Sequence, residues 1–281
     1  MLPSPLRIHA RRLAAALSVP ALLLTTFAAP GTASTTRTAP GPTVWTHNVA
    51  GNAKWRGSNK AVDPLIFAIA SQSNIPVAIG VQEVCLNQAV RLLNWLRAHK
   101  SKHYRMAFRK QSTCRNGKDY GIAVYAIGNL KVTRGTFAGQ HPRDGEKRGY
   151  VCMQSTLRYV ACTAHLTFVG RDNGTYQRAQ VKQMHDVVNS IRRAKKLPVY
   201  WGGDFYMTPP AMRSTLGRNF FRNHREGDVC QNGRYRPTVK NAGGTRKVDY
   251  VLKTAPATCS RDAVVHLSTS QSDHALLGGF L

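Results

Sequence analysis

The sequence predicts a layered α+β protein, in which β-sheets pack on one another and helices cover the outside. Two observations predict this fold class. Runs of β-forming residues recur along most of the chain, and the few helical segments lie between groups of these runs. No internal repeat and no low-complexity tract points to another architecture.

The predicted strands are short runs rich in Val, Ile, Tyr, Phe and Trp, bounded by turn-forming residues. The run 75–84 is almost continuously apolar, and so is the run that starts at Leu197, which indicates strands buried on both faces. In chain order, strands are predicted at 43–49, 75–84, 104–108, 120–127, 131–137, 149–154, 157–166, 197–204, 248–252, 263–267 and 275–280.

Helices are predicted where apolar residues recur at helical spacing. Pro64 is compatible with the first turn of such a helix, and the basic last turn before Leu197 suits a helix dipole without any function. The predicted helices are 60–73, 87–100, 175–196 and 209–216, and the basic segment 219–244 is expected to be irregular.

Carboxylates stand at the ends of several predicted strands. Glu83 ends one apolar run, Asp204 follows two glycines at the end of another, Asp249 lies among β-forming residues, and Asp273 precedes the last run. The chain has only 13 acidic residues against 40 lysines and arginines. Because a buried acid is costly unless it is paired or functional, this placement of scarce acids indicates a reactive site.

Amide and imidazole side chains occur at further strand ends, although Asn48 on its own would be interpreted as a turn residue. Oxygen ligands suit a hard cation such as Mg²⁺ or Ca²⁺, and histidines with carboxylates can transfer protons. These are the groups that hydrolysis of a phosphodiester requires. The full set of polar strand ends is Asn48, Glu83, His165, Asp204, Asp249, Asp273 and His274.

Seven short segments make the chain resemble the endonuclease/exonuclease/phosphatase superfamily, which includes deoxyribonuclease I-like nucleases, inositol phosphatases and sphingomyelinases. The resemblance implies a four-layer α/β/β/α sandwich of two packed, mainly antiparallel sheets with a divalent metal at one edge. The segments are THNVAGN, GVQEVC, YGIAVYA, TAHL, GGDFYMTP, KVDYVL and SDHALL, and they span Thr46 to Leu277.

By this resemblance, Asn48 and Glu83 hold the metal, with Asp273 nearby. The metal is expected to be Mg²⁺, with Ca²⁺ or Mn²⁺ as alternatives.

The resemblance also implies roles for the remaining strand-end residues. Asp249 orients His274, since an acid behind a histidine fixes its tautomer and raises its basicity. Asp204 positions or deprotonates the attacking water, and His165 contacts the phosphate or protonates the leaving oxygen. Which group acts as the base stays open at this point.

Two positions depart from the pattern of the family. Tyr206 stands where the family usually has an asparagine that contacts the phosphate, so the phenol either replaces that contact, alters the pocket or weakens activity. Cys85 stands where pancreatic-type deoxyribonucleases have an arginine that enters the minor groove of DNA. A different loop must therefore hold DNA if DNA is the substrate.

Residues 1–34 have the organisation of an export signal, with arginines, then an apolar segment broken by Pro20, then small residues. Residues 35–42 are expected to be a linker and 43–281 the catalytic domain. No later run is long and apolar enough to span a bilayer, so a secreted product without a membrane anchor is expected. Removal of three arginines with the leader takes the formal charge from +27 to +24.

Six cysteines beyond the leader fit an oxidising compartment and as many as three disulfides. A zinc site is the competing use, but no C-x-x-C spacing is present. Cys152 and Cys162 are expected to pair because they lie on two β-like runs that could face each other in a hairpin. The other two pairs are expected from proximity in the chain. The expected pairs are Cys152–Cys162, Cys85–Cys114 and Cys230–Cys259.

The strongly basic charge indicates a polyanionic partner. Basic residues interleaved with aromatics suit phosphate contacts and base stacking, and three segments have that composition, 54–56, 141–148 and 234–246. Candidate substrate-binding residues are Tyr120, Arg148 and Arg56.

Three functional hypotheses follow. The first is a secreted, metal-dependent nuclease that hydrolyses extracellular DNA, with RNA left open as an alternative substrate, acting as a monomer. The second is a sphingomyelinase-type phospholipid phosphodiesterase, whose exposed apolar hairpin would have to come from Phe220-Phe221. The third is a polyanion-binding relative that lost turnover through Tyr206.

Overall fold

The computed structural model describes residues 43–72, 74–168, 173–226, 236–241, 244–254, 262–265 and 272–280. The predicted leader 1–34 and linker 35–42 lie outside these residues, so their assignment stays a prediction.

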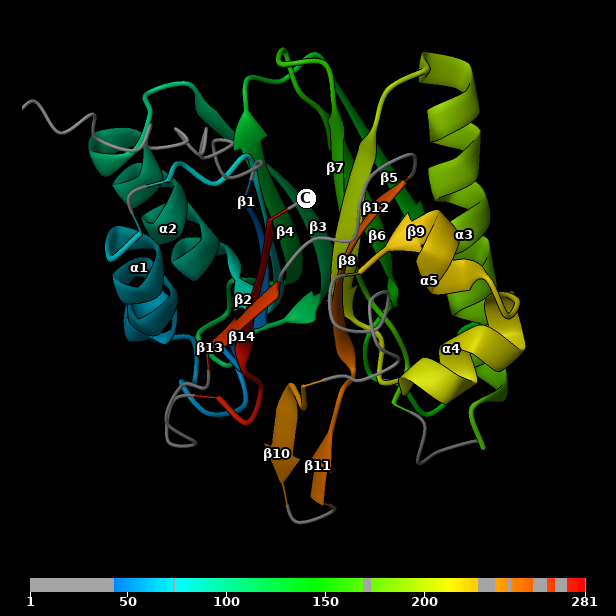
Figure 1. Ribbon diagram of the computed structural model, residues 1–281. Coiled ribbons are helices and arrows are strands. Elements are labelled where there is room, and N and C mark those ends of the chain that lie inside the picture. The colour runs from blue at the N-terminus through cyan, green and yellow to red at the C-terminus, as the bar shows by residue number, and fades with distance from the viewer. Residues whose placement is uncertain are drawn as a thin grey trace, which may run out of the picture. The chain divides into compact units, whose positions relative to one another are not determined.

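Two sheets face each other and helices cover their outer faces (Figure 1), which confirms the predicted four-layer α/β/β/α sandwich. The first sheet has the strand order β13 (Asp262–Val265), β14 (Leu276–Phe280), β1 (Thr43–Asn48), β2 (Ala78–Cys85), β4 (Asp119–Ile127) and β3 (Tyr104–Thr113). The second has the order β5 (Lys131–Thr136), β6 (Gly149–Gln154), β7 (Val160–His165), β8 (Val199–Asp204), β12 (Asp249–Thr254) and β9 (His224–Arg225).

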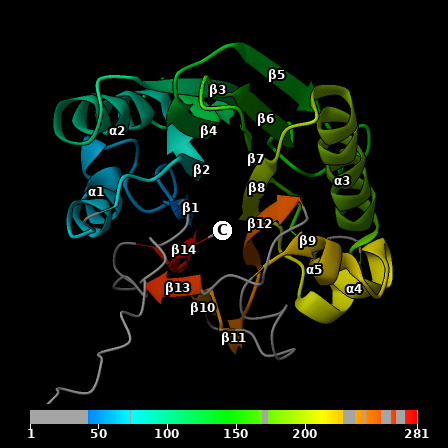
Figure 2. The ribbon, with the colours of Figure 1, turned by 45° about the horizontal axis from the view of Figure 1, so that its top comes forward.

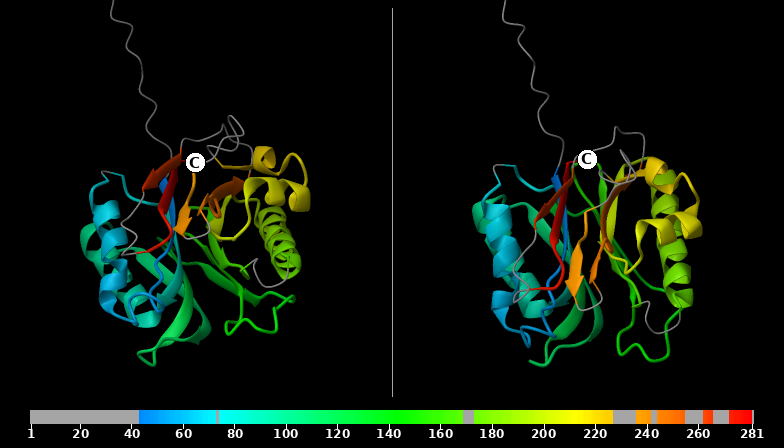
Figure 3. Two further views of the ribbon diagram at one scale, coloured as in Figure 1. Left: turned by 90° about the horizontal axis from the view of Figure 1, so that it is seen from below. Right: turned by 60° about the horizontal axis from the view of Figure 1, so that its bottom comes forward.

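The helices form the two outer layers, as the views in Figures 1 and 2 agree. The 3₁₀ helix η1 (Asn59–Val62), α1 (Asp63–Ala70) and α2 (Leu86–His99) cover the first sheet. Helices α3 (Thr175–Lys195), α4 (Pro209–Leu216) and α5 (Phe220–Asn223) cover the second. A separate hairpin of β10 (Val239–Asn241) and β11 (Gly244–Arg246) leads into the start of β12 (Figure 3).

Each sheet is antiparallel except for one central pair. Strands β1 and β2 run parallel and are joined through η1 and α1, and β7 and β8 run parallel and are joined through α3. A parallel pair needs such a crossover, and the helix of the crossover packs on its own sheet. Each crossover therefore places the carboxyl ends of its two strands at the same edge of their sheet.

Apolar residues fill the three spaces between the four layers. Val44, Val124 and Leu277 are among the buried residues between the sheets, Leu92 and Leu96 of α2 pack on the first sheet, and Trp201 lies beneath the helices of the second. Full burial of such side chains contributes about 1.5–3 kcal/mol each. The nearly continuous apolar runs predicted from the sequence are therefore strands with packed layers on both faces.

Most predicted elements are present, with shifted boundaries. Strand β3 extends to Thr113, five residues beyond its predicted end. Polar side chains alternate along this outer strand, but its backbone stays paired with β4 as far as Thr113. The predicted helix 60–73 begins as the 3₁₀ turn η1 and ends at Ala70. The segment expected to be irregular contains α5 and β9–β11 in its described part.

The proposed apolar hairpin at Phe220-Phe221 is wrong. Both side chains lie on α5, are at most 3 % exposed, and pack into the core against Trp201 and Tyr250 of the second sheet. Their aromatic rings fill the space between α5 and the second sheet and are not available to a membrane.

Two of the three expected disulfides are present. Cys152 and Cys162 lie directly opposite each other on β6 and β7, with Cα atoms 4.0 Å apart. Cys85 and Cys114 join the end of β2 to the β3–β4 turn, with Cα atoms 6.0 Å apart. Cys230 and Cys259 lie outside the described residues. These bonds are compatible with an extracellular protein.

Among the described residues, no helix combines the length and the apolar character needed to cross a membrane.

The two disulfides are expected to stabilise the fold unequally. The Cys85–Cys114 bond closes a chain separation of 29 residues and the Cys152–Cys162 bond one of 10. A chain-entropy estimate gives losses of about 3–4 and about 2–3 kcal/mol when each is removed. Urea unfolding of Cys85→Ala/Cys114→Ala and of Cys152→Ala/Cys162→Ala measures the difference. A larger loss in the second variant would contradict the prediction.

Candidate active site

The predicted polar strand ends meet at one edge of the sandwich. Asn48, His165 and Asp204 end the strands β1, β7 and β8. Strands β12 and β14 run antiparallel to their neighbours, so Asp249 at the start of β12, and His274 just before β14, reach the same edge. In register, Asp204 is paired with both His165 and Asp249.

The amide of Asn48 joins the two sheets. Its Nδ2 donates to Glu83 Oε1 of the first sheet and to Asp204 Oδ2 of the second, both at 3.0 Å. Its Oδ1 accepts from the backbone N–H of Ala50 at 3.0 Å, which fixes the orientation of the amide. Two carboxylates that would repel each other thus share one donor group.

A β-bulge aims Glu83 into the site. Val81 pairs with Ala123 and Val84 with Gly121, so two residues of β2 lie opposite one residue of β4. Glu83 has a φ of 54°, in the left-handed region that costs energy in a residue with a side chain. The Glu83 side chain stays 17 % exposed, whereas those of Asp204, Asp249 and His274 are at most 3 % exposed.

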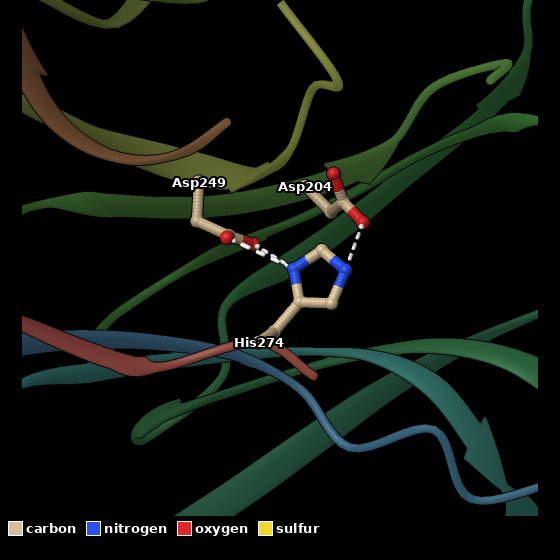
Figure 4. A group of neighbouring side chains, drawn as sticks. All are labelled: Asp204, Asp249 and His274. Carbon is tan, nitrogen blue, oxygen red and sulfur yellow. Dashed lines mark hydrogen bonds and ion pairs between the residues drawn. The ribbon is translucent and has the colours of Figure 1, made fainter. Parts of the chain in front are cut away.

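Asp249, His274 and Asp204 form a buried triad that spans both sheets (Figure 4). His274 Nδ1 lies 2.9 and 3.2 Å from the two oxygens of Asp249, and its Nε2 lies 3.4 Å from Asp204 Oδ2. Burial alone would lower the pKa of His274, but Asp249 and then Asp204 more than offset it and raise the pKa to about 10. The imidazole is therefore a cation held by Asp249.

Asp204 is the member of the triad that titrates near neutral pH. Burial raises its pKa to about 7, opposed mainly by His274. Besides Asn48, the backbone N–H of Tyr206 donates to its Oδ1 at 3.1 Å. A carboxylate with such a pKa can accept a proton from water at physiological pH.

His165 and Arg148 lie side by side on the other flank of Asp204. Arg148 Nη1 is 2.6 Å from Nδ1 and 2.8 Å from Nε2 of His165, whose Nε2 lies 3.7 Å from Asp204 Oδ2. Burial, with the charges of Arg148 and His274, lowers the pKa of His165 well below its usual range. His165 is therefore neutral beside a buried guanidinium.

Two acids of the same loop hold Arg148. Its Nε lies 3.4 Å from Asp144 Oδ2, and its Nη1 lies 3.1 Å from Glu146 Oε2. Burial raises the pKa of Glu146 to about 7, although Arg148 opposes the shift. Tyr120 Oη donates to Glu146 Oε1 at 3.3 Å, so the predicted residues Tyr120 and Arg148 meet at this carboxylate.

Tyr206 stands between the two histidines. Its ring centroid is 5.9 Å from that of His165 and 6.0 Å from that of His274, and its φ of 51° is again left-handed. Burial, then the charges of Asp204 and Glu83, raise the pKa of Tyr206 well above its usual value. Its hydroxyl is therefore a neutral hydrogen-bond donor at every pH of interest.

Two predicted residues stand outside this cluster. Asp273 is half-buried and lies 4.0 Å from Lys54 Nζ, with no described bond to Glu83 or Asn48. Arg56 is exposed on the turn that follows β1, and no described contact joins it to the cluster.

Sequence reasoning missed the acids Asp144 and Glu146, whose side chains are 4 % and 24 % exposed. They stand in HPRDGEKR, which is rich in charge and suggests a solvated loop, and the only signal was that two of 13 acids occur within it. It also missed a polar contact between the sheets, in which Gln82 Nε2 donates to Thr46 Oγ1 at 3.0 Å and to Thr163 Oγ1 at 2.7 Å.

The donor set fits a divalent cation. Five carboxylates of the cluster (Glu83, Asp144, Glu146, Asp204 and Asp249) face two cationic groups, Arg148 and His274. Ligand atoms of Asp204, Asp249 and His274 lie within 4.8 Å of one another and could hold a metal ion, but the raised pKa of His274 keeps its imidazole protonated there. The partly exposed Glu83 beside Asn48 offers oxygen ligands on the solvent side.

A model of the endonuclease/exonuclease/phosphatase family matches residues 45–274 of this chain. The chain belongs to this family. Members of the endonuclease/exonuclease/phosphatase family hydrolyse phosphodiester or phosphate bonds. None of the curated proteins compared with the chain matches its sequence.

Solved structures of this family share the fold at low sequence identity. TDP2 of Danio rerio in complex with a single-strand DNA product has a TM-score of 0.63 and 14 % identity, over 86 % of this chain and 98 % of that one. A family protein of Leptotrichia buccalis gives 0.63 and 15 %, over 85 % and 98 %. The human nocturnin catalytic domain with bound sulfate gives 0.61 and 16 %, over 85 % and 92 %.

Asp249→Asn is expected to lower the pKa of His274 in this family member. Without the charge of Asp249, burial outweighs the remaining attraction of Asp204. In the wild type the folded pKa of about 10 exceeds the ordinary value of 6.5, so the stabilisation is complete below pH 6.5 and is lost as the pH rises toward 10. NMR titration of His274 and urea unfolding between pH 6 and 10 measure both effects. An unchanged His274 pKa would contradict the assignment of the pair.

Proposed function

We propose that this protein is a secreted, divalent-metal-dependent phosphodiesterase, and specifically a nuclease that hydrolyses extracellular DNA, with RNA as a second substrate. The observation that carries the proposal is the convergence of Asn48, Glu83, His165, Asp204 and the Asp249–His274 pair at one edge of the sandwich. These residues come from both sheets, and most of them are buried.

The residues at the edge divide into groups that bind a cation and groups that move protons. Asn48 and Glu83 would hold Mg²⁺, Ca²⁺ or Mn²⁺; Asp273, the third acid or amide expected at the metal, stands outside the cluster beside Lys54. The bound ion would supply positive charge to a non-bridging phosphate oxygen. Asp204, whose pKa lies at about 7, would orient the attacking water and accept its proton.

Positive charge and neutral donors surround the place where charge develops on the phosphate. The imidazolium of His274, fixed by Asp249, would stabilise the phosphoryl oxygens, and the guanidinium of Arg148 would do so from the other flank. The hydroxyl of Tyr206 would donate where the family usually has an asparagine. His165, kept neutral beside Arg148, would contact the phosphate near the leaving oxygen.

Charge and fold neighbours support a nucleic acid as the substrate. The chain has a formal charge of +27, which favours a polymer of phosphates over a small ester. TDP2 of Danio rerio, which shares the fold, is complexed with a single-strand DNA product. The rival sphingomyelinase-type function loses its candidate membrane hairpin, because Phe220 and Phe221 are buried.

The test is hydrolysis of three substrates by the purified chain without residues 1–34. We expect cleavage of plasmid DNA and RNA with Mg²⁺, steep inhibition by salt, and complete loss in EDTA. Release of choline from sphingomyelin vesicles without cleavage of DNA would favour the phospholipid activity. Tight DNA binding without cleavage in any divalent ion would favour a non-catalytic relative, and full cleavage in EDTA would exclude the metal-dependent mechanism.

Glu83→Gln is expected to raise the Mg²⁺ concentration for half-maximal activity by about tenfold or more, because the site loses an anionic oxygen ligand on its solvent side. Asp63→Asn is the matched control, since Asp63 is an exposed acid paired with Arg91 on the outer helices. Mg²⁺ titrations of the rate measure both. Equal Mg²⁺ dependence in the two variants would remove Glu83 from the metal site.

Tyr206→Phe is expected to lower kcat by about 10- to 100-fold, because it removes one neutral donor from the place where charge develops. Tyr206→Asn restores the side chain usual in the family. Steady-state rates on DNA decide between two roles. A large gain in Tyr206→Asn over a nearly inactive parent would show that Tyr206 suppresses turnover, whereas a loss in both variants would show that its hydroxyl serves the reaction.

A further inference from the structure

An exposed aromatic ring lies beside the proposed catalytic residues. Phe168 follows His165 by three residues and is 39 % exposed, although Leu166 and Thr167 before it are fully buried. Its ring packs edge-on against Tyr206, with centroids 5.2 Å apart and planes at 78°. Tyr206 in turn contacts the rings of His165 and His274, so a series of contacting rings leads from the two buried histidines to the exposed Phe168.

Buried glutamines of α3 fix the backbone on both sides of this ring pair. Gln177 Nε2 donates to the carbonyl of Thr167 at 3.4 Å and to that of Phe205 at 3.0 Å, and these are the residues just before Phe168 and Tyr206. Gln180 accepts from the backbone N–H of Thr167 and donates to its hydroxyl, both at 2.8 Å. The position of Phe168 is therefore set by the fold.

The other exposed large apolar side chains lie elsewhere. Among the described residues they are Phe67, Ile75, Val90, Leu130 and Leu157, on helices and turns whose described contacts do not include the catalytic cluster. In the part of the chain that the structure describes, Phe168 is the one exposed large apolar side chain with a contact to that cluster. An exposed phenyl ring beside a charged site loses nothing by being covered with a flat apolar surface and gains dispersion and stacking energy.

We infer that Phe168, supported by Tyr206, forms a stacking subsite for an unpaired nucleobase next to the scissile phosphate. The inference rests on the proposed nuclease function and adds the form of the substrate. A phosphate held near Arg148 and Tyr206 places a neighbouring base within reach of Phe168. Bases in a duplex are already stacked on their neighbours, so an accessible ring favours single strands or frayed ends.

The test compares single-stranded oligonucleotides with and without bases. One substrate carries all its bases, and a matched one has abasic nucleotides on both sides of a single cleavable phosphodiester. The variants are Phe168→Ala, Phe168→Trp and the control Phe67→Ala, which removes an exposed phenyl ring of α1 that is 77 % exposed. Duplex DNA of the same sequence is the third substrate.

Stacking of one base predicts a specific pattern of KM values. Phe168→Ala and removal of the bases should each raise KM by about tenfold, and the two together should raise it no further, because they remove the same contact. Phe168→Trp should keep the wild-type preference, and Phe67→Ala should change nothing. The single strand should have a lower KM than the duplex in the wild type, and Phe168→Ala should remove that difference.

Two failures can be told apart. If the wild type cleaves oligonucleotides but Phe168→Ala leaves the KM for each of the three substrates at its wild-type value, or if the effects of variant and base removal add in full, the stacking subsite is wrong and the nuclease function stands. If the wild type cleaves no oligonucleotide with any divalent ion, both proposals fall.

Discussion

The shared amide of Asn48 is the interaction on which the site depends. Its one NH₂ group donates to a carboxylate of each sheet, so it bridges Glu83 and Asp204, two acids that would otherwise repel each other across the end of the sandwich. The rest of the cluster follows the same logic, since Arg148 is held by two acids and His274 by two more. Burial of so many titratable groups at this edge, together with the charges of their neighbours, explains why their pKa values are shifted.

The architecture and most of the site were predictable because each rests on a local signal. Continuous apolar runs mark strands covered on both faces, and a carboxylate directly after such a run must lie at a sheet edge. Asp204 and Glu83 could be identified as candidate site residues from the sequence for that reason. The pairing of Cys152 with Cys162 was also predictable from the sequence, since two short strands joined by a tight turn bring facing residues together. The family resemblance then supplied the order of the layers, which no single run of residues encodes.

What the sequence did not predict depends on contacts between distant segments. Asp144 and Glu146 belong to a charged run that looks solvated, and only packing of the loop against His165 turns them inward. Phe220 and Phe221 resemble an exposed hydrophobic pair, but the space beneath α5 accommodates both rings. The bulge that turns Glu83 into the site is a matter of register between β2 and β4, and register is a property of two strands at once.

The bond from Gln82 to Thr163 gives the two sheets a fixed alignment. Apolar surfaces attract without preferred direction, so a sandwich held by them alone could slide by a fraction of a residue at little cost. Gln82 stands next to Glu83, and Thr163 stands two positions before His165, so this polar crosslink lies directly behind the reactive edge. Folding and catalytic activity are therefore separable properties of this molecule. A variant without this bond could keep all four layers and its thermal stability and still lose activity, because the two sheets would no longer be held in the same alignment.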